Sequence, residues 1–318
     1  MGEFLSTPNT NQESSRVQLN STAVAYGSMQ GWRKEMEDAH IITSCENYSM
    51  VGVYDGHGGP QVSKYLSLEM KKALMNSSHF ATSIQDALKE TYLSLDATLK
   101  TPQGSKMLND AVHSELYEKS VLSDTNVNLA NTIGSTALTA LFDEYQLTIA
   151  NVGDCRCVLV KRDETLQLTT DQRLNVKAEA DRVVACGGRV VNGRVNGDLM
   201  ISRAFGDTQF KKGNNPEKYI VSATPEITTY DFDGSEEFMI IACDGIFDVM
   251  SNDEVVSFVK ECLDGGILID QICKMILNKC LAENPYEQPG TDNMTFLLAV
   301  FDKSDKWRKC CAGCDVIS

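Results

Sequence analysis

The sequence predicts an α+β fold in which antiparallel β-sheets are covered by helices. Three observations support this class. Apolar residues alternate with polar ones through the middle of the chain, helical patterns occur in pairs on either side of that region, and strands do not alternate with helices one by one. Such segregation of strands and helices favours antiparallel sheets over an alternating parallel sheet.

The first elements are an apolar run and two helical patterns. The run Met50–Tyr54 has the composition of a strand, and after Gly58-Gly59-Pro60 a helical pattern continues to about Asn76. In the second pattern, apolar residues recur at three- and four-residue spacing on one helix face, as expected for a core-facing stripe: Ile84, Leu88, Tyr92, Leu95 and Leu99. Residues 101–131 are polar and irregular and are expected to form an excursion on the surface.

The middle of the chain changes to a period of two. Residues 135–169 predict three or four antiparallel strands joined by hairpins, with turn signals at 143–144 and 162–164. A further strand is expected at 236–245 and a final one at 294–302. Between them, helical patterns occupy about 252–263 and 267–283.

The two ends of the chain are expected to add little to the core. Residues 1–22 are rich in Ser, Thr and Asn, which predicts a flexible N-terminal arm before a domain spanning 23–302. The tail 303–318 contains "KCCAGC" and has too few apolar residues to build a core. Half a zinc site, a redox pair and acylation stay open as alternatives for its Cys310, Cys311 and Cys314.

Composition and charge exclude several classes. The formal net charge is −15, with 44 acidic against 29 basic residues, and it repels phosphate backbones, so nucleic acid is not an expected partner. No apolar run reaches the roughly 18 residues that span a bilayer, and the N-terminus lacks the blocks of a signal peptide. We therefore expect a cytoplasmic or nuclear protein whose 11 cysteines are reduced thiols packed as small hydrophobic residues.

Acidic residues stand at the ends of apolar, strand-like runs. Asp55-Gly56 and Asp244-Gly245 each end such a run, and Asp292-Asn293 immediately precedes another. Glu37 and Asp38 add a further acidic cluster. Carboxylates beside tight glycine turns are the hard oxygen ligands that Mg²⁺ or Mn²⁺ requires. Surface turns without chemistry remain the alternative, because Asp-Gly is also a common hairpin signal.

Ordered motifs along most of the chain resemble one known family. From about Ser28 to Phe301 the chain is similar to the metal-dependent serine/threonine protein phosphatases of the 2C family, on the motifs "SMQGWRKEMEDAH", "VYDGHGG", "GSTA", "NVGDCR", "RVNGDLMISRAFGD", "ACDGIFDVMS" and "TDNMT". The resemblance implies a catalytic domain over 23–302, folded as a four-layer αββα sandwich of two antiparallel β-sheets flanked by helix pairs. It also implies a monomeric enzyme that acts on phosphoprotein substrates at a binuclear Mn²⁺ or Mg²⁺ centre.

The resemblance assigns the principal metal ligands residue by residue. Asp55 would bridge both ions, and the carbonyl of Gly56 would bind one of them. Asp244 and Asp292 would hold the other ion. Two cations about 3.5–4 Å apart can generate a bridging hydroxide at neutral pH and clamp the phosphoryl oxygens during in-line displacement. Carboxylates clustered at strand ends supply the negative charge that such ions need.

The resemblance also assigns supporting residues. Glu37 would act through metal-bound water, and Asp38 would orient the cluster from behind the ligands. Thr136, Asp154 and Asp248 match positions linked to a weaker third metal site.

Two further residues match the family's substrate chemistry. Arg33 would bind the substrate phosphate, since its planar fork donates two hydrogen bonds and stays charged. A surface ion pair with Glu37 is the alternative. His57, one residue past Gly56, matches the family's proposed general acid, and a turn histidine without chemistry is the alternative.

Competing chemistries lack their motifs. No cysteine is followed six positions later by arginine, and G-x-x-x-x-G-K-[ST], G-x-S-x-G and H-E-x-x-H are missing, so the nucleophile is expected to be solvent. A catalytically weak scaffold or regulatory binding protein of the same fold is the rival hypothesis. Retention of all the matched acids and of Arg33 argues against it. A two-metal nuclease conflicts with the acidic charge balance.

One segment departs from the family pattern. Where the family commonly has Asp-His-Lys-Pro, this chain has Asp171-Gln172-Arg173-Leu174. We expect this change, together with the flap that follows to about Gly188, to affect substrate docking and to touch no metal ligand.

The start "MGEFLS" fits the N-myristoylation pattern M-G-x-x-x-[ST], which predicts acylation of Gly2 and peripheral membrane contact. An unmodified polar arm is the alternative. Because one myristoyl chain binds membranes only marginally, acylated tail cysteines would be the obvious second signal.

Overall fold

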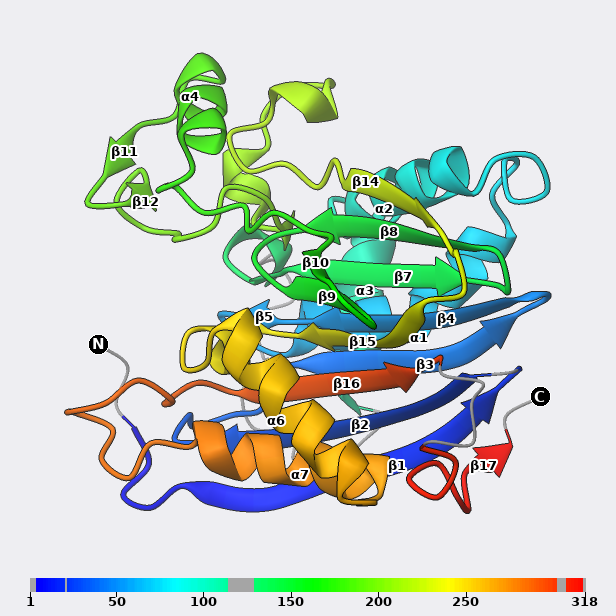
Figure 1. The fold of residues 1–318 in the computed structure, drawn as a ribbon. Coiled ribbons are helices and arrows are strands. Elements are labelled where there is room, and N and C mark those ends of the chain that lie inside the picture. Colours follow the sequence, from blue (N-terminus) through cyan, green and yellow to red (C-terminus); the bar gives the residue numbers. More distant parts are fainter. Residues whose placement is uncertain (1–3, 21, 114–128, 302–306, 317–318) are drawn as a thin grey trace.

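Two β-sheets packed face to face form the centre of the computed structural model, which describes residues 4–20, 22–113, 129–301 and 307–316 (Figure 1). The seven-stranded sheet has the order β10 (Thr165–Gln167), β9 (Arg156–Lys161), β15 (Glu236–Ala242), β16 (Met294–Val300), β2 (Thr22–Gly31), β1 (Asn9–Leu19), β17 (Asp315–Val316). The five-stranded sheet has the order β14 (Glu226–Asp231), β8 (Gln146–Val152), β7 (Ala137–Phe142), β4 (Tyr48–Tyr54), β3 (Ala39–Cys45). Neighbouring strands are antiparallel except for the β1–β17 pair.

Helices cover the outer faces of both sheets. On the five-stranded sheet lie α1 (Gln61–Met75), α2 (Ile84–Leu99) and α3 (Pro102–His113); on the seven-stranded sheet lie α5 (Asp244–Phe247), α6 (Asn252–Asp264) and α7 (Ile269–Cys280). One hydrophobic cluster fills the space between the sheets, and one lies under each set of helices. The four-layer αββα sandwich is therefore confirmed. None of the helices in the described ranges is long and apolar enough to cross a membrane.

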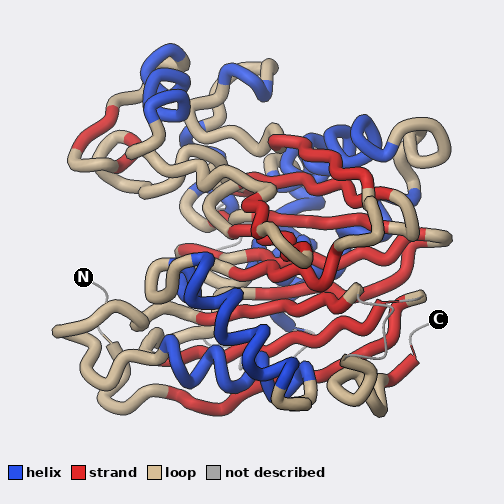
Figure 2. Tube along the Cα trace, viewed as in Figure 1, coloured by secondary structure: helices blue, strands red, loops and turns tan. Residues whose placement is uncertain are grey.

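A loop-rich lobe stands at one end of the sandwich (Figure 2). It contains α4 (Lys177–Ala185), the hairpin β11 (Val190–Val191) with β12 (Arg194–Val195), and the 3₁₀ turns Thr208–Phe210 and Pro216–Lys218. Below it, a small three-stranded sheet has the order β13 (Phe205–Gly206), β6 (Gly134–Ser135), β5 (Gly56–His57), and a further 3₁₀ turn spans Leu129–Asn131. This lobe has its own small apolar cluster around Val183 and Val221.

Local periodicity predicted most elements correctly. The apolar stripe of α2 is buried from Leu88 to Leu99. The strands expected at 135–169 form two hairpins, β7–β8 and β9–β10. The hairpins belong to different sheets, so the chain crosses the sandwich between β8 and β9.

The expectation of a flexible N-terminal arm is wrong for Asn9–Leu19. These residues form β1, which pairs with β2 along its whole length. Only Val17 and Leu19 of the strand are buried, and its other residues are partly or fully exposed because the strand lies next to the sheet edge. Too few apolar positions remain to show a period of two in the sequence.

Two other expectations about polar segments are also corrected. Residues 102–113, expected in a surface excursion, form α3, whose Leu108 and Ala111 are buried against α1 and α2; residues 114–128 lie outside the described part. The tail, expected to add little to the core, buries Trp307 and Cys310 beside α6 and α7. The Trp307 indole donates a hydrogen bond of 2.9 Å to Asp264.

Candidate metal centre

Antiparallel pairing brings the acidic residues together at one edge of the sandwich. Asp38 precedes β3 and Asp55 follows β4, and these strands are antiparallel neighbours with Ala39 opposite Tyr54. In the other sheet, Asp244 comes two residues after the end of β15, and Asp292 comes two residues before its antiparallel neighbour β16. Since the end of one strand lies beside the start of its antiparallel partner, each pair delivers two carboxylates to the same place.

A third strand pair adds to the same edge. Thr136 precedes β7 and Asp154 follows β8, whose ends pair in antiparallel register. The Thr136 hydroxyl accepts a hydrogen bond of 3.0 Å from the Asp55 amide, and the Thr136 amide donates one of 2.8 Å to the Asp55 carbonyl. Thr136 therefore holds the backbone of Asp55 in position.

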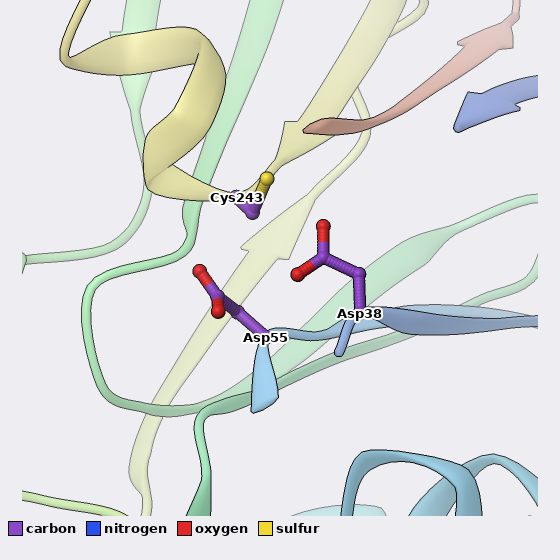
Figure 3. A group of neighbouring side chains, drawn as sticks. All are labelled: Asp38, Asp55 and Cys243. Atoms are coloured by element: carbon purple, nitrogen blue, oxygen red, sulfur yellow. The ribbon is translucent and has the colours of Figure 1, made fainter. Parts of the chain in front are cut away.

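The ligand atoms of Asp38, Asp55 and Cys243 lie within 4.8 Å of one another. Figure 3 shows these three side chains next to one another. Oδ2 of Asp38 accepts a hydrogen bond of 2.6 Å from the Thr295 hydroxyl. Oδ1 of Asp38 is buried and has no hydrogen-bond partner in the described structure. An unpaired buried carboxylate oxygen is costly, and a cation is the partner that would satisfy it.

The acids of this cluster raise one another's pKa values. Burial raises the pKa of Asp55 well above its usual value, and the negative charges of Asp38 and Asp244 raise it further. Burial also raises the pKa of Asp38 to about 7, with a further contribution from Asp292. Carboxylates that disfavour their own ionisation in this way gain most from a bound divalent cation. The donor set of carboxylate oxygens fits Mn²⁺ or Mg²⁺.

Cys243 lies beside the acids, although the sequence suggested only a packed thiol. Burial raises the pKa of its thiol well above the usual value, and the charges of Asp38 and Asp55 add to this shift. The thiol therefore stays protonated at neutral pH and is a poor metal ligand. Its sulfur accepts a hydrogen bond of 3.2 Å from the Thr295 amide, so Cys243 supports the site from the core.

Gly56 is required by a close backbone approach. A Cβ at this position would overlap the carbonyl oxygen of Glu37. The Glu37 amide in turn donates a hydrogen bond of 2.9 Å to the side chain of Asn293, whose own amide group donates to the carbonyls of Gln30 and Glu35. Asn293 was not singled out by the sequence patterns, and it fixes the Glu37 loop next to the end of β15.

Arg33 forms an ion pair across the site. Its Nη2 lies 2.6 Å from Oδ2 of Asp292, and Oδ1 of Asp292 accepts a hydrogen bond of 2.7 Å from the Asn293 amide. The ion-pair partner is therefore a candidate metal ligand. The Arg33 side chain is 43% exposed, which leaves it accessible to a ligand from solvent.

His57 pairs with a residue that the sequence did not single out. Its Nε2 lies 2.7 Å from Oδ2 of Asp207, whose side chain is 3% exposed. Burial lowers the pKa of His57, but the carboxylate of Asp207 outweighs burial, and the net pKa is raised. Only the motif "RAFGD", in which Asp207 is the last residue, could have signalled this partner.

Arg173 contacts three acids at once. Its Nε lies 2.6 Å from Asp154, its Nη2 2.9 Å from Asp244 and its Nη1 2.9 Å from Asp248. Contrary to the expectation for the Asp171-Gln172-Arg173-Leu174 departure, Arg173 contacts a predicted metal ligand, Asp244. That long side chain crosses from the base of the lobe to the strand ends, a path that local sequence does not reveal.

The structure thus gathers the predicted site residues at one edge. Electrostatic coupling links the acids of both sheets, including Asp154 and Asp248, and reaches Glu37 and His57. The role of Gly56 as a metal ligand and the link of Thr136 to a third metal site remain predictions. Gly2 lies outside the described residues. Among the described residues, Cys310, Cys311 and Cys314 form no disulfide and do not join a group of metal ligands.

Comparison with known proteins gives a consistent result. The family model "Protein phosphatase 2C" matches residues 22–287. "Probable protein phosphatase 2C 60" of Arabidopsis thaliana is 34% identical, over 95% of this chain and 92% of that protein. "Probable protein phosphatase 2C 3" of Paramecium tetraurelia is 32% identical, over 95% of this chain and 100% of that protein.

Solved structures share the fold. A phosphatase from Toxoplasma gondii superposes with a TM-score of 0.72 at 22% identity, over 92% of this chain and 96% of that one. Because the family model covers most of the chain and the relatives align over nearly their full length, the chain belongs to the protein phosphatase 2C family and is a metal-dependent serine/threonine protein phosphatase.

Proposed function

We propose that this phosphatase uses a centre of two divalent ions, Mn²⁺ or Mg²⁺, held by Asp55, the Gly56 carbonyl, Asp244 and Asp292 with Asp38 next to them, to hydrolyse phosphoserine and phosphothreonine in proteins. When bound, two such ions activate water and neutralise the phosphoryl oxygens during in-line displacement. The observation that carries the proposal is the buried acidic cluster, in which Asp38 Oδ1 lacks a partner and burial and mutual repulsion raise the pKa of Asp55.

Arg33 and His57 supply the remaining chemistry in this proposal. The exposed guanidinium of Arg33 can turn from Asp292 to a phosphate, for which its fork geometry is suited. His57 holds a proton because Asp207 stabilises its imidazolium form. Because His57 Nε2 is hydrogen-bonded to Asp207, Nδ1 is the His57 nitrogen that can donate a proton to the departing serine or threonine oxygen.

The metal requirement is tested on the full chain after treatment with a chelator. An aryl phosphate and a phosphothreonine peptide should both be hydrolysed only after Mn²⁺ or Mg²⁺ is restored. Hydrolysis that persists without metal would contradict the two-ion centre. Metal binding by calorimetry without hydrolysis of either substrate would favour the scaffold hypothesis, and cleavage of DNA in place of the phosphopeptide would favour a nuclease.

We further propose that Gly2 is myristoylated, on the pattern "MGEFLS", in a monomeric protein of the cytoplasm or nucleus that contacts membranes peripherally. Intact-mass measurement on protein from its native cells should show the acyl group on wild type and not on Gly2→Ala. An unmodified Gly2 amine in the wild type would overturn this proposal. Light scattering at micromolar concentration tests the monomer.

A further inference from the structure

Arg173 is the distinctive cation of this site. Its guanidinium donates to Asp154, Asp244 and Asp248, which come from the ends of β8 and β15 and from the C-cap of α5. The carboxylate of Asp248 accepts two hydrogen bonds from Arg173, one of 2.9 Å from Nη1 and one of 3.2 Å from Nη2. A planar fork with five donors can bridge several carboxylates in this way, which a single ammonium group cannot do.

The acids that Arg173 joins include those assigned to the third metal position. Asp154 and Asp248 match that position in the sequence, and both now have their charge compensated within the chain. The Asp154 side chain is only 6% exposed, and its Oδ2 bonds directly to Arg173 Nε. An ion entering between these acids would have to displace a guanidinium of its own charge sign.

The backbone holds Arg173 in this position. The preceding residue, Gln172, is buried. Its backbone amide donates a hydrogen bond of 3.0 Å to the carbonyl of Gly153, and its side-chain oxygen accepts one of 2.7 Å from the Gly153 amide. The Gln172 carbonyl accepts hydrogen bonds from both the amide and the hydroxyl of Ser202. These hydrogen bonds hold the segment against Gly153, the residue before Asp154, and against Ser202 of the lobe. The backbone position of Arg173 is therefore fixed.

We propose that Arg173 is a built-in cation that takes the place of the third metal ion, so that this phosphatase binds two divalent ions per chain. The bond to Asp244 uses Oδ2 and leaves Oδ1 for an ion of the binuclear centre. Within the described residues, Arg173 hydrogen-bonds to Asp154, Asp244 and Asp248, and the carboxylates of Asp55, Asp38 and Asp292 keep their charge for the two-ion centre. This inference rests on the proposed function and adds the stoichiometry of its metal site.

The test counts bound Mn²⁺ by calorimetry and by electron paramagnetic resonance on chelator-treated full chain. Wild type should bind two ions, and Arg173→Gln should bind a third. The third ion should bind roughly 10- to 1,000-fold more tightly than in wild type, the range by which one adjacent opposite charge changes the proton affinity of a carboxylate. Arg173→Lys introduces the residue that the family commonly has at this position. This variant should also bind a third ion, with lower affinity than Arg173→Gln.

A matched control is Arg156→Gln. Arg156 is another half-buried arginine near this edge, but its ion pair of 2.7 Å is with Asp171, which is not among the acids that Arg173 joins. Its substitution removes one positive charge and should leave two ions bound. Three ions of similar affinity in wild type, or two ions in both Arg173 variants, would overturn the inference. No Mn²⁺ binding by wild type would instead overturn the proposed function itself.

Thermal unfolding gives a second readout without turnover. In the absence of metal, Arg173→Gln leaves three neighbouring carboxylates uncompensated and should unfold at a lower temperature than wild type. Added Mn²⁺ should raise its midpoint by more than it raises that of wild type, because an additional ion binds the folded state only. Equal Mn²⁺-induced shifts in the two proteins would contradict the proposed place of Arg173.

Discussion

Nε2 of His57 lies 2.7 Å from Oδ2 of Asp207, and the two residues are 150 positions apart in the chain. The small sheet β13-β6-β5 creates this contact, since His57 ends β5 and Asp207 directly follows β13 on the other side of β6. The backbone of Asp207 has φ of 46°, a left-handed conformation that Asp and Asn tolerate better than most residues. The pair orients the imidazole and favours its protonated form.

Replacing Asp207 by Asn should lower turnover on a phosphopeptide more than on an aryl phosphate, whose leaving group needs little protonation. Asn keeps the size and tolerates the positive φ, so the effect comes from charge. Without the carboxylate the pKa of His57 falls, and because the acid must be protonated, the alkaline limb of the pH–rate profile should move to lower pH. The profile of kcat against pH checks this; an unmoved limb would separate Asp207 from the proton transfer.

His57→Ala is the reference for that experiment. Removal of the general acid should lower turnover on a phosphopeptide by roughly 10²- to 10⁴-fold, with less loss on an aryl phosphate. Calorimetry should show that Mn²⁺ still binds, since His57 is not among the proposed ligands. Equal losses on both substrates would mean that His57 does not protonate the leaving group.

Gly134→Ala should separate His57 from Asp207 without altering either residue. A Cβ at Gly134 would overlap both Asp207 Oδ2 and His57 Nε2. We expect the same selective loss on phosphopeptides as in Asp207→Asn, together with a decrease of about 1–3 kcal/mol in the free energy of unfolding from overpacking. Turnover on both substrates and urea unfolding measure the two effects, and wild-type turnover in a folded variant would contradict the assigned pairing.

Asp244→Ala should weaken Mn²⁺ binding and abolish activity at low metal concentration. Asp244 lies two residues after the end of β15, inside the acidic cluster, and burial raises its pKa, so its carboxylate gains from a cation. Excess Mn²⁺ should restore part of the activity, in contrast to His57→Ala. Calorimetric titration and turnover across Mn²⁺ concentrations make the comparison. Unchanged Mn²⁺ affinity with full activity would remove Asp244 from the ligand set.

Metal-free protein should lose stability as the pH rises from about 4 to 7. The pKa of Asp38 is raised to about 7 in the folded state, so between these values the folded state binds more protons than the unfolded state, and the free energy of unfolding falls with pH. For one such group the slope is at most about 1.4 kcal/mol per pH unit.

The check on that slope is urea unfolding at several pH values, with and without saturating Mn²⁺. The bound ion should reduce the slope because it holds the carboxylates ionised. Asp38→Asn, which cannot ionise at this position, should make the metal-free dependence shallower, while Asp55 and Asp244 still contribute to it. A metal-free wild type that grows more stable over this range would show that the acidic cluster does not control its stability.

Trp307→Ala should lower the free energy of unfolding by about 3–5 kcal/mol, the range for a buried tryptophan. Trp307 is 1% exposed, packs against Phe238 and donates to Asp264. Lys309→Ala, two residues away and exposed, is the control and should change stability little. Chemical denaturation of both variants measures the difference, and equal stabilities would show that the tail does not contribute to the core.

Sequence patterns were sufficient where the interaction is local or repeats along a strand or helix. The period of the apolar residues predicted the helices and strands, because burial of one face requires that spacing. Asp55, Asp244 and Asp292 were recognisable because each stands at the end of an apolar run. Antiparallel pairing then requires such ends to meet, so the gathering of the acids follows from the strand order.

The tertiary structure decided the contacts that no local pattern carries. Arg173 reaches Asp244 and Asp248, 71 and 75 residues further along the chain, and His57 reaches Asp207 only because β6 separates their strands. The burial of Trp307 and the pairing of the polar strand β1 likewise depend on surfaces built by distant segments. Side-chain reach and sheet order in three dimensions determine these contacts, and neither leaves a periodic signal in the sequence.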